Sequence, residues 1–163
     1  MAKPERIEIP DGLFERFVNA HVNLDLDELR ACISEDTTWL SGGPGWMVQG
    51  ADDVVSVRSH EWDGPNAKIR SLRWVDGPYG VQRDDVICAW GLVQLEMDTK
   101  EPPVSAGVLD KRCTLVLRRD GGRWRVLLDH WSRPRVDEYV HFQQDDDPKT
   151  VRFYDYVPLA APM

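Results

Sequence analysis

The sequence is poor in cysteine, in basic charge and in long apolar runs, and each shortage excludes a class of protein. The three cysteines, Cys32, Cys88 and Cys113, form no Cys-x-x-Cys pair, so we expect reduced thiols and neither a disulfide framework nor a zinc site. The net charge of −8 and the pI near 4.9 disfavour nucleic acid and anionic membrane surfaces as partners. No run of about 18 apolar residues is present, so we expect no segment that spans a bilayer.

The rest of the composition is that of an ordinary folded domain. The chain has 163 residues, of which 42% are hydrophobic and 29% charged. A chain of this length can bury enough surface to fold without a metal or a disulfide. The first residues carry no apolar stretch typical of a secretory signal, so we expect a cytoplasmic location.

Helical periodicity comes first along the chain and strand patterns follow. The apolar spacing predicts a helix capped by Asp11, a short helix over 28–33 that Asp25 or Asp27 opens, and a third helix over 51–62. Runs rich in β-branched and aromatic residues, bounded by glycine and proline, predict the strands. These strands cover residues 37–40, 68–75, 85–97, 108–118 and 123–132.

The resulting order of elements, α-α-β-α-β-β-β-β, favours an α+β fold over a doubly wound parallel sheet. We assign residues 1–135 to one domain and residues 136–163 to a C-terminal extension. The extension is acidic, with Asp145, Asp146 and Asp147 in a row, but it also carries aromatic residues. We therefore expect part of it to dock on the sheet or on a partner subunit, where it would act as a lid.

The last two expected strands meet at Gly121 and Gly122, a strong signal for a β-hairpin. A tight turn there pairs even-numbered residues before it with odd-numbered residues after it, and cross-strand partners share a face. One face is then polar at both ends, and the other is almost wholly apolar. The polar face carries Arg112, Thr114, Val116, Arg118, Arg125, Leu127, Asp129 and Trp131. The apolar face carries Cys113, Leu115, Leu117, Trp124, Val126, Leu128 and His130.

Two assignments of these faces fit the pattern. In the first, the apolar face packs on the helices, and the charged residues lie in water. In the second, the polar face looks toward the helices, and a second subunit covers the apolar face, which predicts a homodimer through the sheet.

Several short stretches, in this order and spacing, are similar to one known family. The layout over roughly residues 11–133 resembles the SnoaL-like branch of the nuclear transport factor 2-like superfamily. The stretches are Phe17-Val18-Asn19-Ala20-His21, Asp25-Leu26-Asp27, Asp36-Thr37-Thr38-Trp39, Gly50-Ala51-Asp52, Arg118 to Trp124, and His130-Trp131-Ser132. The resemblance implies a cone-shaped, curved antiparallel sheet wrapped around three N-terminal helices, with a small-molecule pocket at the open end. It also implies no cofactor, dimerisation through the outer sheet face, and a hairpin whose polar face points inward.

In that orientation Asp129 is the candidate catalytic base, because burial beside apolar walls and Trp131 would raise its pKa. Arg112, diagonally opposite on the next strand, would orient the substrate or stabilise an enolate-like oxyanion. The same two residues can also form an exposed salt bridge with no chemistry. His130 lies on the opposite face from Asp129, so we expect no dyad between them. The expected substrate-binding residues are Trp39, Thr114, Trp131, Ala89 and Gly91.

Two functions remain open from the sequence. The first is a cofactor-independent enzyme of secondary metabolism that transfers a proton on an apolar or aromatic substrate, as a cyclase, isomerase or dehydratase does. The second is a non-catalytic small-molecule-binding or assembly domain of the same fold, since fold alone does not give function.

Overall fold

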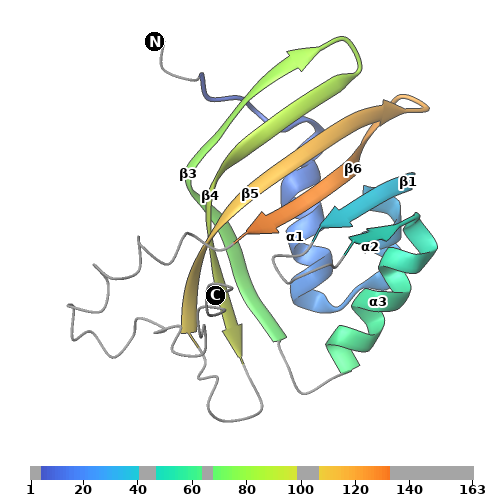
Figure 1. Ribbon diagram of the computed structural model, residues 1–163, viewed down its shortest axis with the longest axis vertical. Helices are drawn as coiled ribbons and strands as arrows, with labels where there is room; N and C mark the ends of the chain where they lie inside the picture. Colours follow the sequence, from blue (N-terminus) through green and yellow to red (C-terminus); the bar gives the residue numbers. More distant parts are fainter. Residues whose placement is uncertain (1–4, 41–46, 64–67, 99–106, 133–163) are drawn as a thin grey trace, which may run out of the picture.

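The computed structural model describes residues 5–40, 47–63, 68–98 and 107–132 of the chain. It has the expected α+β fold, in which helices and a curved sheet form separate layers (Figure 1). The helices are η1 (Pro10–Gly12), α1 (Leu13–Asn23), α2 (Leu26–Cys32) and α3 (Ala51–Asp63). The strands are β1 (Ile33–Leu40), β2 (Met47–Gln49), β3 (Lys68–Arg83), β4 (Val86–Asp98), β5 (Gly107–Asp120) and β6 (Arg123–Ser132).

The first two helices start differently from one another. Asp11 does not cap α1, because it lies within the preceding 3-10 turn at φ 59°, and the residue before α1 is Gly12, which has no side chain for this purpose. Asp25 does cap α2, since its carboxylate accepts a hydrogen bond of 2.9 Å from the backbone N–H of Glu28. The buried face of α1 consists of Leu13, Phe14, Phe17, Val18, Ala20 and His21.

The strands form one mixed sheet in the order β2-β1-β6-β5-β4-β3. The expected antiparallel run from β3 to β6 is confirmed, while β1 pairs parallel to β6 and β2 adds an edge strand that the sequence pattern did not indicate. Figure 1 shows the long strands curving around the helices, which lie against one face of the sheet. This inner face, together with the helices, encloses the core.

The strand expected over 68–75 continues further than its pattern predicts. Asp76, Gly77 and Pro78 do not end it, and β3 runs on to Arg83 with register shifts between Trp74 and Tyr79. These irregularities let the chain pass a turn-like sequence while it still pairs with β4, and they bend the strand. The prediction that the strand ends at Val75 is therefore wrong.

The β5–β6 hairpin combines both assignments that the sequence left open. Its turn residues Gly121 and Gly122 have φ of 58° and 83°, as a two-residue turn of this kind requires. The predicted pairing holds as far as Leu117 and Val126, and then it shifts by one residue, so that Leu115 faces Asp129. Since successive side chains alternate between faces, this shift changes which residues of β6 look inward.

Leu127 is the extra residue at the shift and forms a β-bulge. Before the bulge, the even-numbered residues of β6 point inward, and after it the odd-numbered residues do. The apolar face of β5 therefore packs on the helices, yet Asp129 also lies on the inner side. The inward set on the two strands is Cys113, Leu115, Leu117, Trp124, Val126, Asp129 and Trp131.

Within the described ranges, no helix is long and apolar enough to cross a membrane. The expected extension over residues 136–163 lies outside the described residues, so its docking stays a prediction.

Candidate functional site

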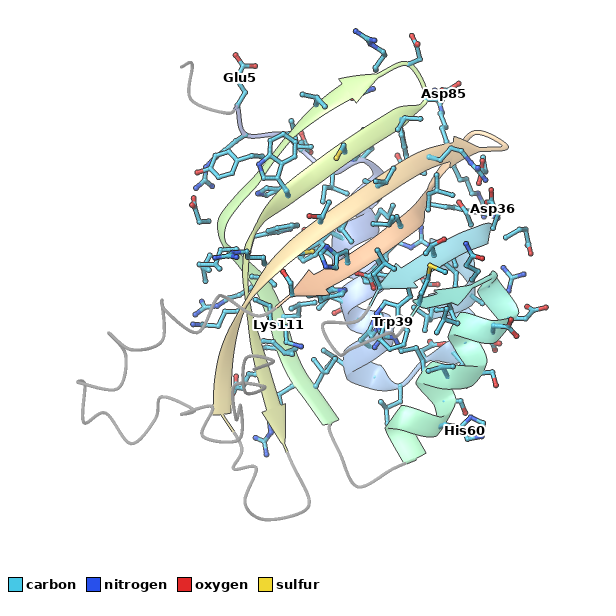
Figure 2. All side chains as sticks on the ribbon, in the orientation of Figure 1. Glu5, Asp36, Trp39, His60, Asp85 and Lys111 are labelled. Atoms are coloured by element: carbon cyan, nitrogen blue, oxygen red, sulfur yellow. The ribbon has the colours of Figure 1, made fainter. Side chains whose placement is uncertain are left out.

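One row of residues runs across the inner face of the sheet and places a carboxyl among apolar side chains. Ala89 pairs with Leu115, Leu115 with Asp129, and Asp129 with Trp39 on the parallel strand β1. All four side chains are buried, and Asp129 is only 5% exposed. The sheet register alone therefore brings Trp39 and Asp129 side by side. In Figure 2, Trp39 lies on β1, on the side of the sheet where α3 packs.

Arg58 reaches this row from α3. Its Nη2 atom lies 3.5 Å from Oδ2 of Asp129, and its guanidinium carbon lies 3.9 Å from the ring centroid of Trp39. The arginine side chain is 13% exposed. Stacking on the indole is a favourable position for a guanidinium removed from water. Arg58 thus contacts both the carboxyl and the aromatic wall.

Burial raises the pKa of the Asp129 carboxyl to about 7. Loss of hydration is the main cause, and the charges of Arg58 and Lys111 and the indole N–H of Trp131 oppose it only in part. Among the described residues, Oδ1 of Asp129 and Nε1 of Trp131 are both buried without a hydrogen bond of good geometry. At neutral pH this carboxyl is therefore divided between its acid and base forms, which suits a group that gives and takes protons.

His21 is the second titratable group of this interior. Its Nδ1 donates a 2.8 Å hydrogen bond to the carbonyl of Phe17, and its ring packs edge-on against the Phe17 ring, with centroids 4.5 Å apart. Burial, followed by the positive charge of Arg58, lowers the His21 pKa to about 3. The imidazole is therefore neutral at physiological pH, and Nε2 is its basic atom.

The nearest thiol, Cys113, is unsuited to act as a nucleophile. It is 1% exposed, and both burial and the charge of Asp129 raise its pKa well above the usual value. A thiol must ionise to attack or to bind a metal. In the ranges that the structure describes, no group of three His, Cys, Asp or Glu side chains is placed to hold a metal ion.

The structure contradicts the expected positions of Arg112 and Thr114. Arg112 is exposed, and Thr114 is half-buried on the outer side of β5, where it pairs with His130. The bulge at Leu127 is the physical reason, because it turns Asp129 inward while the even-numbered residues of β5 stay outside. The predicted pairing of Asp129 with Arg112 is wrong, and Arg58 is the arginine beside Asp129.

Gly91 points inward but does not leave room for a ligand. A side chain there would meet the backbone oxygen of Asp76 at 2.4 Å and ring carbons of Trp74 at 3.0 and 3.1 Å. Trp74 packs in turn on Phe14 of α1, with ring centroids 5.0 Å apart. The small residue thus accommodates Trp74 and the bent strand β3, and the prediction that it opens a pocket is wrong. Ala89 is fully buried in the row that contains Asp129.

Sequence reasoning missed Arg58, although the pattern of α3 holds a signal for it. Ala51 and Val54 are buried, and Arg58 follows them on the same helical face at positions i, i+3 and i+7. A charged residue on an otherwise apolar stripe indicates a partner inside the fold. His60, two residues further along α3, is by contrast exposed and projects from the end of the helix (Figure 2).

Thr37 supports the bulge that orients Asp129. Its buried hydroxyl lies 3.0 Å from the carbonyl oxygen of Val126 and 3.3 Å from that of Leu127, and it can donate to either. Replacing Thr37 with valine keeps the shape but leaves these carbonyls without the donor. We expect Thr37→Val to lower the free energy of unfolding by about 1–3 kcal/mol, measured by urea denaturation. A variant as stable as the wild-type protein would show that the hydroxyl does not support the bulge.

Comparisons with known proteins agree with this architecture. The sequence profile of the SnoaL-like domain matches residues 11–137. No curated protein matches the chain. A nuclear transport factor 2-like protein of unknown function from Pseudomonas putida is 21% identical over 75% of this chain and 82% of its own, with a TM-score of 0.55.

Two further solved structures are similar in fold. A nuclear transport factor 2-like superfamily protein from Salmonella enterica serovar Typhimurium is 13% identical, covers 76% of this chain and 87% of its own, and has a TM-score of 0.64. A nuclear transport factor 2-like protein from Cytophaga hutchinsonii is 14% identical, covers 75% and 93%, and has a TM-score of 0.61. At these identities the similarity establishes the fold alone.

Proposed function

Since the chain belongs to the SnoaL-like domain family, we propose that it is a cofactor-independent enzyme of secondary metabolism that moves a proton on an apolar or aromatic small molecule. Its reaction would be that of a cyclase, an isomerase or a dehydratase. The observation that carries the proposal is the buried Asp129 carboxyl, whose pKa is raised to about 7. A general acid or base works best when its pKa lies near the working pH.

The residues around Asp129 take complementary roles in this proposal. Asp129 removes or returns the proton, and Arg58 takes the role that we first expected for Arg112. Arg58, whose Nη2 lies 3.5 Å from Oδ2 of Asp129, orients the substrate or stabilises an enolate-like oxyanion as negative charge develops. Trp39 and Trp131 supply flat apolar surface for an aromatic substrate. All of these groups come from the chain itself.

The test uses a carbon acid that any such site should ionise. The probe is 2-tetralone, an aromatic ketone whose protons next to the carbonyl exchange for deuterium in D₂O, followed by NMR. We expect the wild-type protein to accelerate exchange and Asp129→Asn to lower that acceleration by at least about 100-fold. Asp120→Asn is the matched control, because Asp120 binds Arg118 at the distant hairpin end. Asp129→Asn activity within a few-fold of wild type would remove Asp129 as the base.

The alternative, a non-catalytic binding or assembly domain, is favoured by one observation. Asp129 is paired with Arg58, and a buried ion pair can exist without any chemistry. In that case the protons next to the carbonyl of 2-tetralone and of related bicyclic ketones would exchange no faster with the wild-type protein than in buffer alone.

We also propose a homodimer through the outer sheet face, with different residues from those first expected. Leu115 belongs to the core, at 1% exposure, so it cannot form the interface. The outer face instead carries the half-buried apolar residues Val116 and Leu128 on the central strands β5 and β6. The helices lie against the other face (Figure 1), so an apolar outer face would be covered by a second copy.

Sedimentation of a Val116→Glu variant tests this interface. We expect the wild-type protein to sediment as a dimer and Val116→Glu as a monomer, because the new charge would be buried at the contact. Met47→Glu is the control, since Met47 is 60% exposed on the edge strand β2. A Val116→Glu variant that remains dimeric would contradict the interface.

A further inference from the structure

Two buried polar atoms lie next to each other in the site. Oδ1 of Asp129 and Nε1 of Trp131 are both shielded from solvent and have no protein hydrogen-bond partner within the described part of the chain. They belong to residues two apart on the inner face of β6, and the indole N–H is near enough to favour the ionised carboxyl. Buried polar groups in folded proteins nearly always have partners, so this pair calls for one.

The other oxygen of the carboxyl is already engaged. Oδ2 of Asp129 faces Nη2 of Arg58 at 3.5 Å, so Oδ1 is the oxygen left for a ligand. An indole N–H only donates a hydrogen bond, whereas a carboxylate oxygen only accepts one. A hydroxyl satisfies both atoms at once, because it donates to Oδ1 and accepts from Nε1–H. A carbonyl would satisfy the indole alone.

We propose that Asp129 Oδ1 and Trp131 Nε1–H together bind one hydroxyl of the substrate, so that the substrate is a phenol or an enol attached to a flat ring system. This inference rests on the proposed function and names its substrate class. The other titratable groups of this interior agree with a neutral hydroxyl. Arg58 from α3 and Lys111 from β5 disfavour a cationic ligand, and the buried His21 and Cys113 carry no charge at neutral pH.

Bound in this way, the hydroxyl proton lies at the atom that would accept it. Transfer would break the O–H bond of the substrate, form an O–H bond on Asp129 and leave the electron pair on the substrate oxygen. That oxyanion would keep the hydrogen bond from Trp131 and lie close to the positive charge of Arg58.

Calorimetry with two matched probes tests the proposal. 2-Naphthol and 2-methoxynaphthalene share one ring system, but only the naphthol can donate a hydrogen bond. We expect the full-length wild-type protein to bind 2-naphthol at least about tenfold more tightly at pH 7.5. Trp131→Phe keeps an aromatic ring and removes the N–H, so we expect the preference to fall to about threefold or less. Trp124→Phe, a buried tryptophan at the far end of β6, is the control and should keep the full preference.

Each failure has its own meaning. Equal binding of the two probes by the wild-type protein overturns the proposal, and so does a Trp131→Phe variant that keeps the preference. Absence of binding by both probes also overturns it, because the two atoms would then have closed on each other. If exchange of 2-tetralone still depends on Asp129 in any of these cases, the proposed function stands and only the substrate class is rejected.

Discussion

An Asp129→Asn variant is expected to gain stability relative to the wild-type protein as the pH rises from about 4 to about 8. The folded protein holds the Asp129 proton up to a pKa of about 7, whereas the unfolded chain releases it near 3.8. Between these values the folded state binds more protons, so wild-type stability falls as pH rises. The shift corresponds to at most about 4 kcal/mol in the free energy of unfolding, and asparagine, which does not titrate, lacks this loss.

Urea denaturation of both proteins at a series of pH values measures this difference. Asp120→Asn supplies a control of opposite sign, because the hydrogen bond from Arg118 lowers the Asp120 pKa. The stability that Asp120 contributes is present above its unfolded pKa of 3.8 and is lost as pH falls through its lower folded pKa. Asp120→Asn should therefore lose relative stability as pH rises toward about 4 and change little above that pH. If the difference in the free energy of unfolding between Asp129→Asn and wild type did not change with pH, the Asp129 carboxyl would not have a raised pKa in the folded protein.

A His21→Gln variant is expected to resist acid better than the wild-type protein. Burial lowers the His21 pKa from 6.5 to about 3, so between these values the unfolded chain binds the additional proton. Wild-type stability therefore falls as pH drops through this range, by at most about 5 kcal/mol. Glutamine can still donate to the Phe17 carbonyl but does not titrate, so the variant lacks this loss.

The same denaturation series checks this result, with His60→Gln as its control. His60 is exposed on α3 and hydrogen-bonds only to a carbonyl of its own helix, that of Ser56, among the contacts the structure describes for it. If both variants changed the pH profile equally, the buried position of His21 would not be the cause.

Asp129 and His21 thus act on stability with opposite signs over nearly the same pH range. As pH rises from about 4 to about 6.5, the first removes stability and the second adds it. In the wild-type protein the two pH dependences of the free energy of unfolding largely cancel. Removing one titrating group by substitution leaves the pH dependence of the other visible. Two buried groups near one arginine can therefore keep the fold stable while one of them remains available for proton transfer.

Sequence periodicity was sufficient to predict most of the secondary structure. The buried spacing of α1, the Asp25 cap of α2 and the hairpin turn at Gly121 and Gly122 all depend on local interactions, which neighbouring residues encode. The continuation of β3 past Pro78 could not be predicted, because pairing with β4 overrides a local turn signal. The length of β3 is therefore set by tertiary contacts rather than by its local sequence.

The site was less predictable, for two physical reasons. A bulge adds one residue without leaving a distinct pattern, and the extra Leu127 exchanged the faces of the last part of β6. Its support, the Thr37 hydroxyl, lies about 90 residues earlier in the chain. Arg58 likewise meets Asp129 only in the folded chain. The family resemblance led us to expect Asp129, Trp39 and Trp131 near one another with Arg112 as their arginine, whereas the structure has Arg58 beside Asp129.

The most direct measurement of the central claim is the titration of Asp129 itself. In a protein labelled with ¹³C at aspartate, the side-chain carboxyl resonance of Asp129 can be assigned by its absence from Asp129→Asn and followed against pH. The buried position beside Arg58 predicts a midpoint near pH 7, because burial raises the pKa to about that value. A midpoint at or below about 4, the value of a solvated aspartate, would contradict a buried carboxyl at the centre of the site.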